Sequence, residues 1–378
     1  MTQARLMIGD SEHDADMLYL SGIFVPDPWI AVELGGRWHG LFSALEVDRA
    51  RRTSRLDVVE LDTEWRRQAR ERFGAAAGLA GAAACYLEAH GVTCAEVPAQ
   101  FPFGCVGVLQ RAGIAVRACS GPFFPQRARK RPEEIRELAR AERLTARAMG
   151  RAIDFLGACS IGDDGVLRHP DRGRARLRAA DLRGVIEQWL IARGAVPSHT
   201  IVACGRQGAD PHNEGRGLLY AHRPIIIDIF PRLTASGYWG DMTRTVVKGR
   251  AEPLVAAMHR AVAAAQRAGL EAIGDGVAAR TVHRRVQAVL EQHGFTTGVR
   301  RGRRFGFFHG TGHGVGLEVH EAPRISDCDD LLCSGQVVTV EPGLYDPRVG
   351  GVRIEDLVVV TETGCRNLTR FPRRLEIA

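Results

Sequence analysis

Four carboxylates and one histidine stand inside runs of residues that otherwise predict buried β-strands. They are Asp228, Asp241, His313, Glu341 and Glu355. A carboxylate in a β-branched run is costly to bury unless it is paired or coordinates a metal. One such residue is compatible with an ion pair in a core, but the whole set is better explained by cations that these side chains hold together.

The donor set indicates which cations these are. Hard oxygen donors with one imidazole suit Mn²⁺, Zn²⁺, Co²⁺ or Fe²⁺, and they need no thiolate. Four carboxylates carry too much negative charge for one divalent ion. Two ions about 3.5–4 Å apart, bridged by shared carboxylates, balance that charge and form the clamp of a hydrolytic two-metal site.

Two of the carboxylates also have purely structural interpretations. Asp228 shares a strand face with Ile226 and Phe230, because side chains alternate with a period of two, and taken alone it indicates a buried salt bridge. Asp241 follows Gly240 and taken alone indicates a turn. The metal interpretation is favoured for both once the other motifs are considered with them.

The remaining three candidates also have both a structural and a functional interpretation. Glycines flank His313 and let the backbone approach a ligand or another strand closely, although a flexible loop would also carry them. Glu341 ends a predicted strand before Pro342, where an edge carboxylate is the simpler interpretation. Glu355 is predicted in the middle of a strand, where a solvated glutamate is hard to place, so a metal-bridging role is favoured.

The ordered series Asp, Asp, His, Glu, Glu resembles the metallopeptidase family of methionine aminopeptidase, aminopeptidase P and prolidase, over roughly residues 130–370. His309 and Arg353 resemble its proline-specific branch. Asp228 and Asp241 stand thirteen residues apart, farther than is usual in the family, which predicts an enlarged hairpin between them. The matching words are Gly237-Tyr238, Asp241-Met-Thr-Arg-Thr245, His309-Gly-Thr-Gly-His313-Gly-Val-Gly316, Val340-Glu341-Pro-Gly343 and Val352-Arg-Ile-Glu355-Asp356.

This resemblance implies a fold and an activity. The expected fold class is α+β, with a smaller creatinase-like α/β domain at the N-terminus and a pita-bread catalytic domain after it in the sequence. The expected activity is hydrolysis of the bond between an N-terminal residue and a following proline in dipeptides or short peptides, through a hydroxide bridging two divalent ions. Mn²⁺ is the first choice of metal, with Zn²⁺ or Co²⁺ as alternatives.

The resemblance also implies a role for each site residue. Glu341 is expected to shuttle a proton besides binding metal, and Arg353 to orient the carboxylates and contact His309 or the substrate. Three histidines are expected to stabilise the tetrahedral intermediate and assist proton transfer. The implied metal ligands are Asp228, Asp241, His313, Glu341 and Glu355, and the implied further catalytic residues are His212, His309, His320 and Arg353.

Three alternatives stay open. Methionine aminopeptidase chemistry would use the same ligands, but the additional N-terminal domain and the pair His309 and Arg353 favour the proline-specific branch. Creatinase-like C–N hydrolysis without metal shares the fold, yet it does not need all five ligand types. A non-catalytic binding protein is the third alternative, and the intact ligand set disfavours it.

An arginine run, Arg300–Arg304, precedes the histidine motif. Such runs usually form a solvated face. A sharper hypothesis is that Arg301, Arg303 or Arg304 holds the free carboxylate of a short peptide at the mouth of the site.

A length of 378 residues suggests two domains, and a proline-containing basic segment after Gly121 predicts the boundary. We therefore expect an α/β domain over residues 1–128 and the catalytic domain over residues 129–378. The motif Asp-x-x-Tyr-Leu-Ser-Gly22 resembles the N-terminal domain of creatinase, prolidase and aminopeptidase P. In those relatives this domain helps to build oligomers, so a homodimer or higher homo-oligomer is expected.

Periodicity predicts the elements that position the site. In the first domain we expect a helix over residues 62–90 and strands at 106–109 and 114–117. In the second domain we expect helices outside paired strands that carry the site. The four clearest helices are predicted at residues 132–157, 182–192, 253–272 and 277–293.

Composition limits the partners. The net charge of +7, from 51 basic and 44 acidic residues, is spread along the chain, without a zinc-finger spacing or a basic helix with interleaved aromatics. Nucleic-acid binding is therefore not expected. No apolar run is long enough for a membrane span, and the first residues lack the apolar core of a signal peptide, so the expected location is the cytoplasm.

Overall fold

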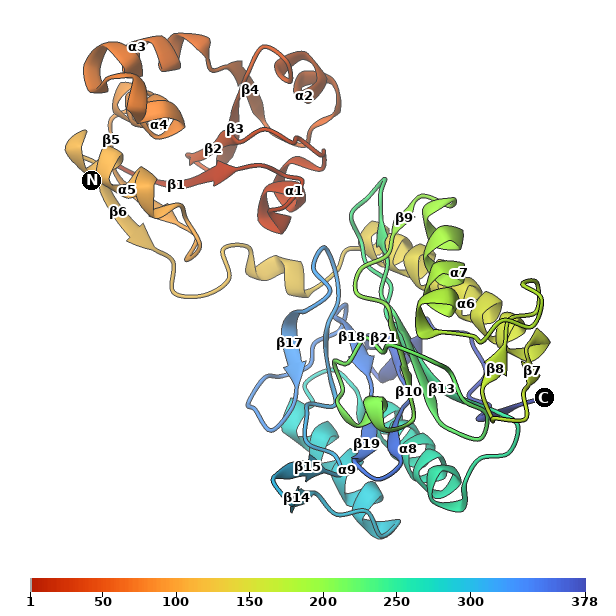
Figure 1. Ribbon diagram of the computed structural model, residues 1–378. Coiled ribbons are helices and arrows are strands. Elements are labelled where there is room, and N and C mark those ends of the chain that lie inside the picture. The colour runs from red at the N-terminus through yellow and green to blue at the C-terminus, as the bar shows by residue number, and fades with distance from the viewer. Residues whose placement is uncertain (1) are drawn as a thin grey trace. The chain divides into compact units, whose positions relative to one another are not determined.

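The structure is a computed structural model that describes residues 2–378, which form two compact units divided between Arg127 and Ala128 (Figure 1). The first unit contains a six-stranded sheet of order β4-β3-β2-β1-β5-β6. Its elements are β1 (Thr2–Gly9), α1 (Ala15–Ser21), β2 (Trp29–Leu34), β3 (Arg37–Phe42), α2 (Val47–Thr53), β4 (Val58–Leu61), α3 (Thr63–Phe73), α4 (Gly78–Ala89), β5 (Val92–Val97), α5 (Phe103–Arg111) and β6 (Ala115–Ala118).

Helices cover both faces of this sheet. Because side chains alternate along a strand, Leu6 and Ile8 of β1 face the core formed with α4 and α5, whereas Met7 packs into a second core with residues of α1 and α2. The α/β architecture expected for this segment is confirmed.

Two local predictions in this unit differ from the structure. The helix expected over residues 62–90 is interrupted at Gly74, whose φ of 83° lies in a region that side chains avoid. The segment 106–109, predicted as a strand, lies inside α5 and buries Val108 and Leu109 on one helical face. A short apolar run does not distinguish a strand from one side of a buried helix. The strand predicted at 114–117 is confirmed as β6.

The second unit carries two larger sheets, ordered β10-β11-β13-β23 and β17-β16-β18-β21-β22. Its helices are α6 (Pro132–Ala158), α7 (Ala179–Ile191), α8 (Pro253–Ala272) and α9 (Ala279–Gln292). Its strands are β7 (Ser160–Ile161), β8 (Leu167–Arg168), β9 (Ala195–Val196), β10 (Ile201–Cys204), β11 (Ile225–Ile229), β12 (Arg232–Leu233), β13 (Met242–Lys248), β14 (Gly298–Arg300), β15 (Arg303–Phe305), β16 (Gly312–Gly314), β17 (Glu321–Ile325), β18 (Val337–Val340), β19 (Gly343–Asp346), β20 (Gly350–Arg353), β21 (Asp356–Thr361), β22 (Gly364–Asn367) and β23 (Glu376–Ile377).

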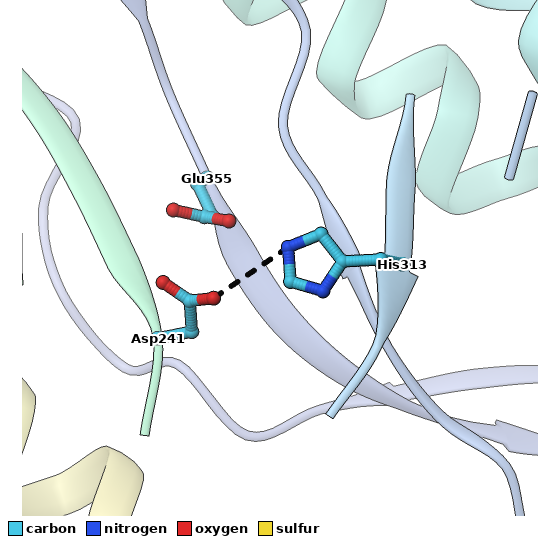
Figure 2. Close-up of side chains that lie close together, drawn as sticks. All are labelled: Asp241, His313 and Glu355. Carbon is cyan, nitrogen blue, oxygen red and sulfur yellow. Dashed lines mark ion pairs between the residues drawn. The ribbon is translucent and has the colours of Figure 1, made fainter. Parts of the chain in front are cut away.

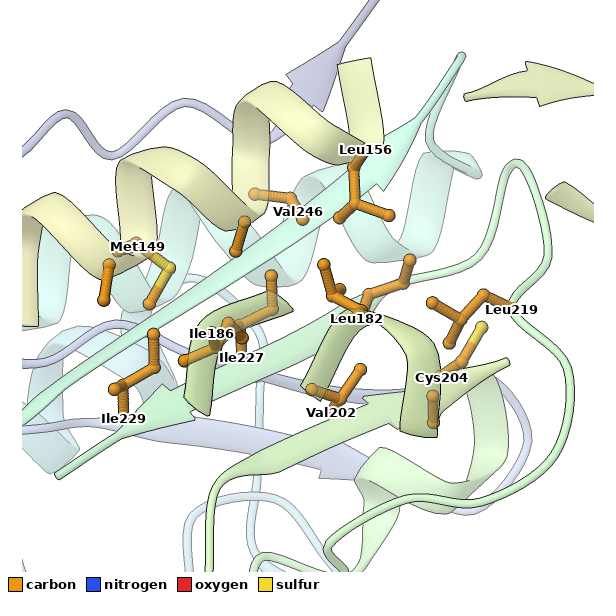
Figure 3. Close-up of a cluster of buried hydrophobic side chains, with 14 of the residues drawn as sticks. Met149, Leu156, Leu182, Ile186, Val202, Cys204, Leu219, Ile227, Ile229 and Val246 are labelled. Carbon is orange, nitrogen blue, oxygen red and sulfur yellow. The ribbon is translucent and has the colours of Figure 1, made fainter. Parts of the chain in front are cut away.

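Helices α6 and α7 pack on the sheet that contains β11 and β13 (Figure 3). The contact is made by an apolar stripe on each helix, which is how an amphipathic helix buries one face. The helical side chains labelled in Figure 3 are Met149, Leu156, Leu182 and Ile186, and they meet Val202, Ile227, Ile229 and Val246 of the strands. The prediction of helices outside paired strands is confirmed.

The start of α6 follows the sequence signals. Pro132 occupies the first turn, where its missing N–H costs nothing, and the Glu134 carboxylate accepts a hydrogen bond from the backbone N–H of Arg131 at 2.8 Å. Glu134 also accepts from the Tyr238 hydroxyl at 2.7 Å, which ties α6 to the segment that leads into β13.

The two large sheets are joined near the candidate site. The backbone N–H of Glu355 donates to the carbonyl of Thr243 at 3.1 Å, and the Arg244 guanidinium pairs with Asp356 at 2.8 Å in a fully buried setting. The beginning of β13 and the beginning of β21 are thereby held side by side.

Within residues 2–378, every helix is too short or too polar to span a membrane.

Candidate metal centre

A cavity of about 1060 Å³ lies in the second unit, and every predicted site residue lines it. The predicted residues on its wall are His212, Asp228, Asp241, His309, His313, His320, Glu341, Arg353 and Glu355. They come from strands and connections that are far apart in the sequence.

Three of these residues form the tightest cluster. Each of Asp241, His313 and Glu355 offers a ligand atom within 4.8 Å of those of the other two, and all three are buried (Figure 2). His313 Nε2 lies 3.7 Å from Asp241 Oδ2 and 3.4 Å from Glu341 Oε1. Figure 2 shows the two carboxylates facing one another, each with one oxygen on the side of the imidazole. Such a gap between acceptors suits an ion placed among them.

Glycine is required on both sides of His313. A Cβ at Gly312 would lie 1.9 Å from the carbonyl oxygen of Thr339, and one at Gly314 would lie 2.3 Å from that of Ala322. No side chain fits at such distances, so the glycines allow the backbone of β16 to approach its neighbours.

Asp228 lies on β11 and faces the same cavity. Its Oδ2 accepts from Arg353 Nη2 at 2.5 Å, whereas its Oδ1 is buried and has no hydrogen-bond partner among the described residues. A buried anionic oxygen without a partner is unfavourable unless something else binds it. This carboxylate therefore has both the salt bridge suggested by the sequence and a second oxygen that is available to a cation.

The carboxylates of the cluster repel one another. Burial, followed by repulsion from Glu355 and Asp228, raises the pKa of Asp241 well above its ordinary value. Burial and then repulsion from Glu341 and Asp228 do the same to the pKa of Glu355. Burial raises the pKa of Glu341 to about 7. A divalent cation among these carboxylates would remove the repulsion, so the donor set fits a metal.

The His313 imidazole is neutral and has one ring nitrogen available to bind a metal. Burial lowers its pKa to about 3. Its Nδ1 lies 3.2 Å from the carbonyl oxygen of Gly314, which can only accept, so Nδ1 carries the proton and Nε2 presents a lone pair to the carboxylates. A hydrogen bond of this kind fixes the ring of a ligating histidine.

Glu355 departs from the predicted local structure. It does not lie in the middle of a strand but in the connection between β20 and β21, and Thr243 Oγ1 donates to its Oε2 at 2.8 Å. Glu341 directly follows the end of β18, as predicted.

Tyr345 is a site residue that the sequence motifs did not reveal. His309 Nδ1 donates to the Gly310 carbonyl at 2.7 Å, so the bare Nε2 accepts from the Tyr345 hydroxyl at 2.9 Å. The same hydroxyl accepts from Arg353 Nη1 at 3.0 Å. Arg353 therefore reaches His309 through Tyr345, and it contacts Asp228 directly.

The other two histidines remain accessible to a ligand. The ring of His320 stands 4.3 Å from that of His313, centroid to centroid, at 82°. Burial, followed by the charge of Arg324, lowers the pKa of His320. His212 is exposed on the cavity wall, where its backbone N–H donates to Asp210.

Further residues at the cavity had no sequence signal. His199 lines the cavity with Nδ1 at 2.7 Å from Glu214 Oε1. Glu142 of α6 is buried behind the site and accepts from the backbone N–H of Asp241 at 3.0 Å and from Thr369 Oγ1 at 2.6 Å.

The arginine run does not line the cavity. Residues 300–304 form the exposed β14–β15 hairpin, whose turn at Arg301 and Gly302 has positive φ angles. The arginines on the cavity wall are Arg324 and Arg353. The structure thus places Arg324, and not the run, where a substrate carboxylate could be held.

Comparisons with known proteins agree on a family. The sequence profile of metallopeptidase family M24 matches residues 136–362. The chain is 33% identical over 221 residues to the Xaa-Pro dipeptidase of Pyrococcus furiosus, covering 58% of this chain and 61% of that protein. It is 36% identical over 198 residues to the probable dipeptidase PepE of Mycobacterium tuberculosis, covering 52% and 51%. The match thus spans between half and two thirds of these curated relatives.

Solved structures resemble the chain over nearly its whole length. The X-Pro aminopeptidase from Thermotoga maritima superposes with a TM-score of 0.81 at 22% identity, covering 100% of this chain and 98% of that one. Dipeptidase PepE from Mycobacterium ulcerans superposes with a TM-score of 0.75 at 26% identity, covering 100% and 93%. The predicted fold class, an α+β pita-bread domain that follows a smaller α/β domain in the sequence, is confirmed.

Proposed function

This chain belongs to metallopeptidase family M24, and we propose that it is a metal-dependent exopeptidase that hydrolyses the bond between an N-terminal residue and a following proline. The observation that carries the proposal is the convergence of Asp241, His313 and Glu355 in one cavity with Asp228 and Glu341. The relatives named as an Xaa-Pro dipeptidase and an X-Pro aminopeptidase support the choice of a proline-directed peptidase over methionine aminopeptidase.

The proposed ligands hold two divalent ions, with Mn²⁺ as the first choice and Zn²⁺ or Co²⁺ as alternatives. Bound there, the ions supply a Lewis acid that polarises the scissile carbonyl and makes water a nucleophile near pH 7. The unpartnered Oδ1 of Asp228 and the crowded carboxylates support this assignment. The metal ligands are Asp228, Asp241, His313, Glu341 and Glu355.

Glu341 is the proposed proton carrier. Its carboxylate lines the cavity, with Oε1 3.4 Å from His313 Nε2, and a carboxylate placed there can take up a proton and return it. It takes a proton from the attacking water and returns it to the leaving proline nitrogen.

The histidines divide their roles in this proposal. His320 and His212 donate hydrogen bonds to the oxygen that becomes negatively charged, since both line the cavity and neither ring bonds to the backbone of residues 2–378. His309 has both ring nitrogens engaged, so it acts with Tyr345 to hold Arg353 against Asp228.

Arg324 is the proposed anchor for the free carboxylate of a dipeptide. It is a cation on the cavity wall, and the other arginine there, Arg353, is already paired with Asp228. A hydrogen-bonded ion pair with a substrate carboxylate is worth about 1.5–3 kcal/mol. Arg324→Met is therefore expected to raise KM for Gly-Pro by about tenfold to a hundredfold while changing KM for Gly-Pro-Gly-Gly much less.

Steady-state kinetics on both peptides test this prediction. Arg303→Met, which alters the exposed hairpin, is the matched control and should leave both KM values unchanged. Equal effects of Arg324→Met on the two peptides would remove the carboxylate anchor.

A substrate panel tests the proposed function itself. Purified protein with added Mn²⁺, Zn²⁺ or Co²⁺ is assayed on Xaa-Pro, Xaa-Pro-Xaa, longer Xaa-Pro peptides, Met-Ala and creatine. We expect cleavage of the Xaa-Pro substrates and loss of activity with chelator. Cleavage of Met-Ala alone would indicate methionine aminopeptidase chemistry, chelator-resistant hydrolysis of creatine would indicate a creatinase-like enzyme, and no hydrolysis would indicate a binding protein. Assembly as a homodimer or higher oligomer stays a prediction, which light scattering can check.

A further inference from the structure

A buried ion pair lies outside the cavity lining. Lys130 Nζ stands 2.7 Å from Glu321 Oε1, and the two side chains are 2% and 8% exposed. The two residues are separated by 191 positions in the sequence. Taking two charges out of water is expensive and is often not repaid in stability. The Lys130–Glu321 pair therefore indicates a role other than stabilising the fold.

Lys130 is fixed in place by the backbone around it. Its N–H donates to the carbonyl of Gly335 at 2.8 Å, and its Nζ donates to the carbonyl of Ala128 at 3.4 Å. The residue before it, Arg129, forms a β-bridge with Gln336. The segment that carries the Lys130 ammonium group is thereby fixed against the residues that precede β18.

Glu321 fixes the turn formed by residues 315–320, which follows the strand of His313. The backbone N–H of Glu318 donates to its Oε2 at 3.4 Å. A Cβ at Gly316 would lie 2.4 Å from its Oε1, so the carboxylate packs directly against the backbone of the turn.

Trp239 holds the turn as well. Its backbone N–H donates to the carbonyl of Gly316 at 3.1 Å, and its Nε1 donates to that of Leu317 at 3.0 Å. The turn is therefore held by the indole of Trp239 and by a carboxylate whose own charge is balanced by Lys130.

The turn ends at His320, whose ring packs edge to face on that of His313. We propose that the Lys130–Glu321 pair is a positioning device, which fixes the turn 315–320 and so holds His320 beside the metal-ligand His313. Lys130 and Glu321 are positioning residues in this proposal, because neither is among the described residues that line the cavity. The part of the inference that concerns catalysis rests on the proposed function.

The test must separate positioning from stability. Removing one partner leaves an unpaired buried charge and destabilises a protein strongly, whereas replacing both partners by neutral groups of similar volume is often tolerated. The informative variant is therefore the double replacement Lys130→Met with Glu321→Gln. Lys130→Arg, which keeps the charge, serves as rescue. The matched control is Arg284→Met with Asp327→Asn, which removes an ion pair of exposed side chains at 3.0 Å.

Amide hydrogen exchange of metal-free protein, followed by mass spectrometry, reports on the turn without any activity. In the double variant we expect the amides of residues 315–320 to exchange at least tenfold faster than in the parent, with α8 unchanged. The control variant and Lys130→Arg should match the parent. Exchange within twofold of the parent in the double variant would overturn the proposal.

Kinetics on Gly-Pro at saturating Mn²⁺ give the second readout. In the double variant, displacement of His320 should lower kcat about tenfold and leave KM within threefold of the parent value. A purely structural role of the ion pair would change the melting temperature but would not lower kcat selectively. Faster exchange with an unchanged kcat would contradict the positioning of His320. If the parent protein hydrolyses no Xaa-Pro peptide, the proposed function fails, and the exchange measurement still decides whether the pair holds the turn.

Discussion

Replacing Glu341 by glutamine is expected to lower kcat for Gly-Pro by about a thousandfold at saturating Mn²⁺. Proton transfer by a positioned side chain contributes about 10²–10⁴ to the rate. The Glu341 carboxylate lines the cavity and can both accept and return a proton, which an amide cannot. Glutamine keeps the shape of the side chain and the hydrogen bond from Thr339 Oγ1, so the loss measures the proton carrier.

Metal content has to be measured on the same samples, since Glu341 is also a proposed ligand. The kcat values of Glu341→Gln and of the parent are each divided by the fraction of metal-loaded sites. Plasma emission analysis gives that fraction, and steady-state kinetics give kcat. Glu291→Gln, an exposed position on α9, is the matched control and should retain full activity. A Glu341→Gln protein that binds metal fully and keeps kcat within tenfold of the parent would contradict the assigned role.

Removal of metal is expected to lower the melting temperature of the second unit by about 10 °C at pH 8. An ion bound at about a thousand times its Kd stabilises the folded state by about 4 kcal/mol, and each kcal/mol shifts the melting temperature of a unit of this size by about 2–4 °C. The chelated site also keeps its repelling carboxylates without a counter-charge.

The pH dependence has a definite sign. Burial and repulsion raise the folded pKa of Asp241 and of Glu355 well above the ordinary value of about 4. Between the ordinary and the raised pKa, the folded chelated protein binds more protons than the unfolded chain, so its stability falls as pH rises. The gap in melting temperature between the metal-loaded and the chelated protein should therefore widen from pH 6 to pH 8.

Asp241→Asn provides the control for this prediction. With one repelling charge removed, the chelated variant should melt higher than the chelated parent at pH 8, and added Mn²⁺ should stabilise it far less. Calorimetry over pH 6–8 gives all four curves. A gap that narrows toward pH 8, or a chelated variant that melts below the chelated parent, would show that these carboxylates do not repel one another in the fold.

The residue types that bind metal could be predicted from the sequence because they conflict with their surroundings. Asp228 in an isoleucine run and His313 between glycines both violate the pattern of an ordinary buried strand, and a functional site explains such conflicts. The structure brings both to the wall of one cavity. Glu341 also lies where it was expected, directly after β18.

Residues that act through distant partners could not be predicted in this way. Tyr345 lies on β19 outside the motifs quoted from the sequence, and its role arises only because the fold brings it against His309 and Arg353. Glu142 lies on a helix face that by its pattern is ordinary, yet it accepts a hydrogen bond from the backbone of Asp241 across 99 positions.

Local errors have similar causes. Glu355 lies between Ile354 and Leu357 and is therefore predicted at the centre of a strand, but the strand is interrupted there because the Glu355 N–H bonds across to β13. The run Arg300–Arg304 stands next to the histidine motif in the sequence, but a tight hairpin keeps it off the cavity wall. In both places the neighbouring residues in the sequence did not predict where the side chains lie in the fold.

Diffraction from crystals grown with Mn²⁺, recorded on both sides of the manganese absorption edge, tests the metal centre most directly. We expect two anomalous peaks in the cavity, within bonding distance of side-chain atoms from Asp228, Asp241, His313, Glu341 and Glu355. An empty cavity at full Mn²⁺ saturation, or manganese bound elsewhere on the chain, would contradict the dinuclear site on which the proposed reaction depends.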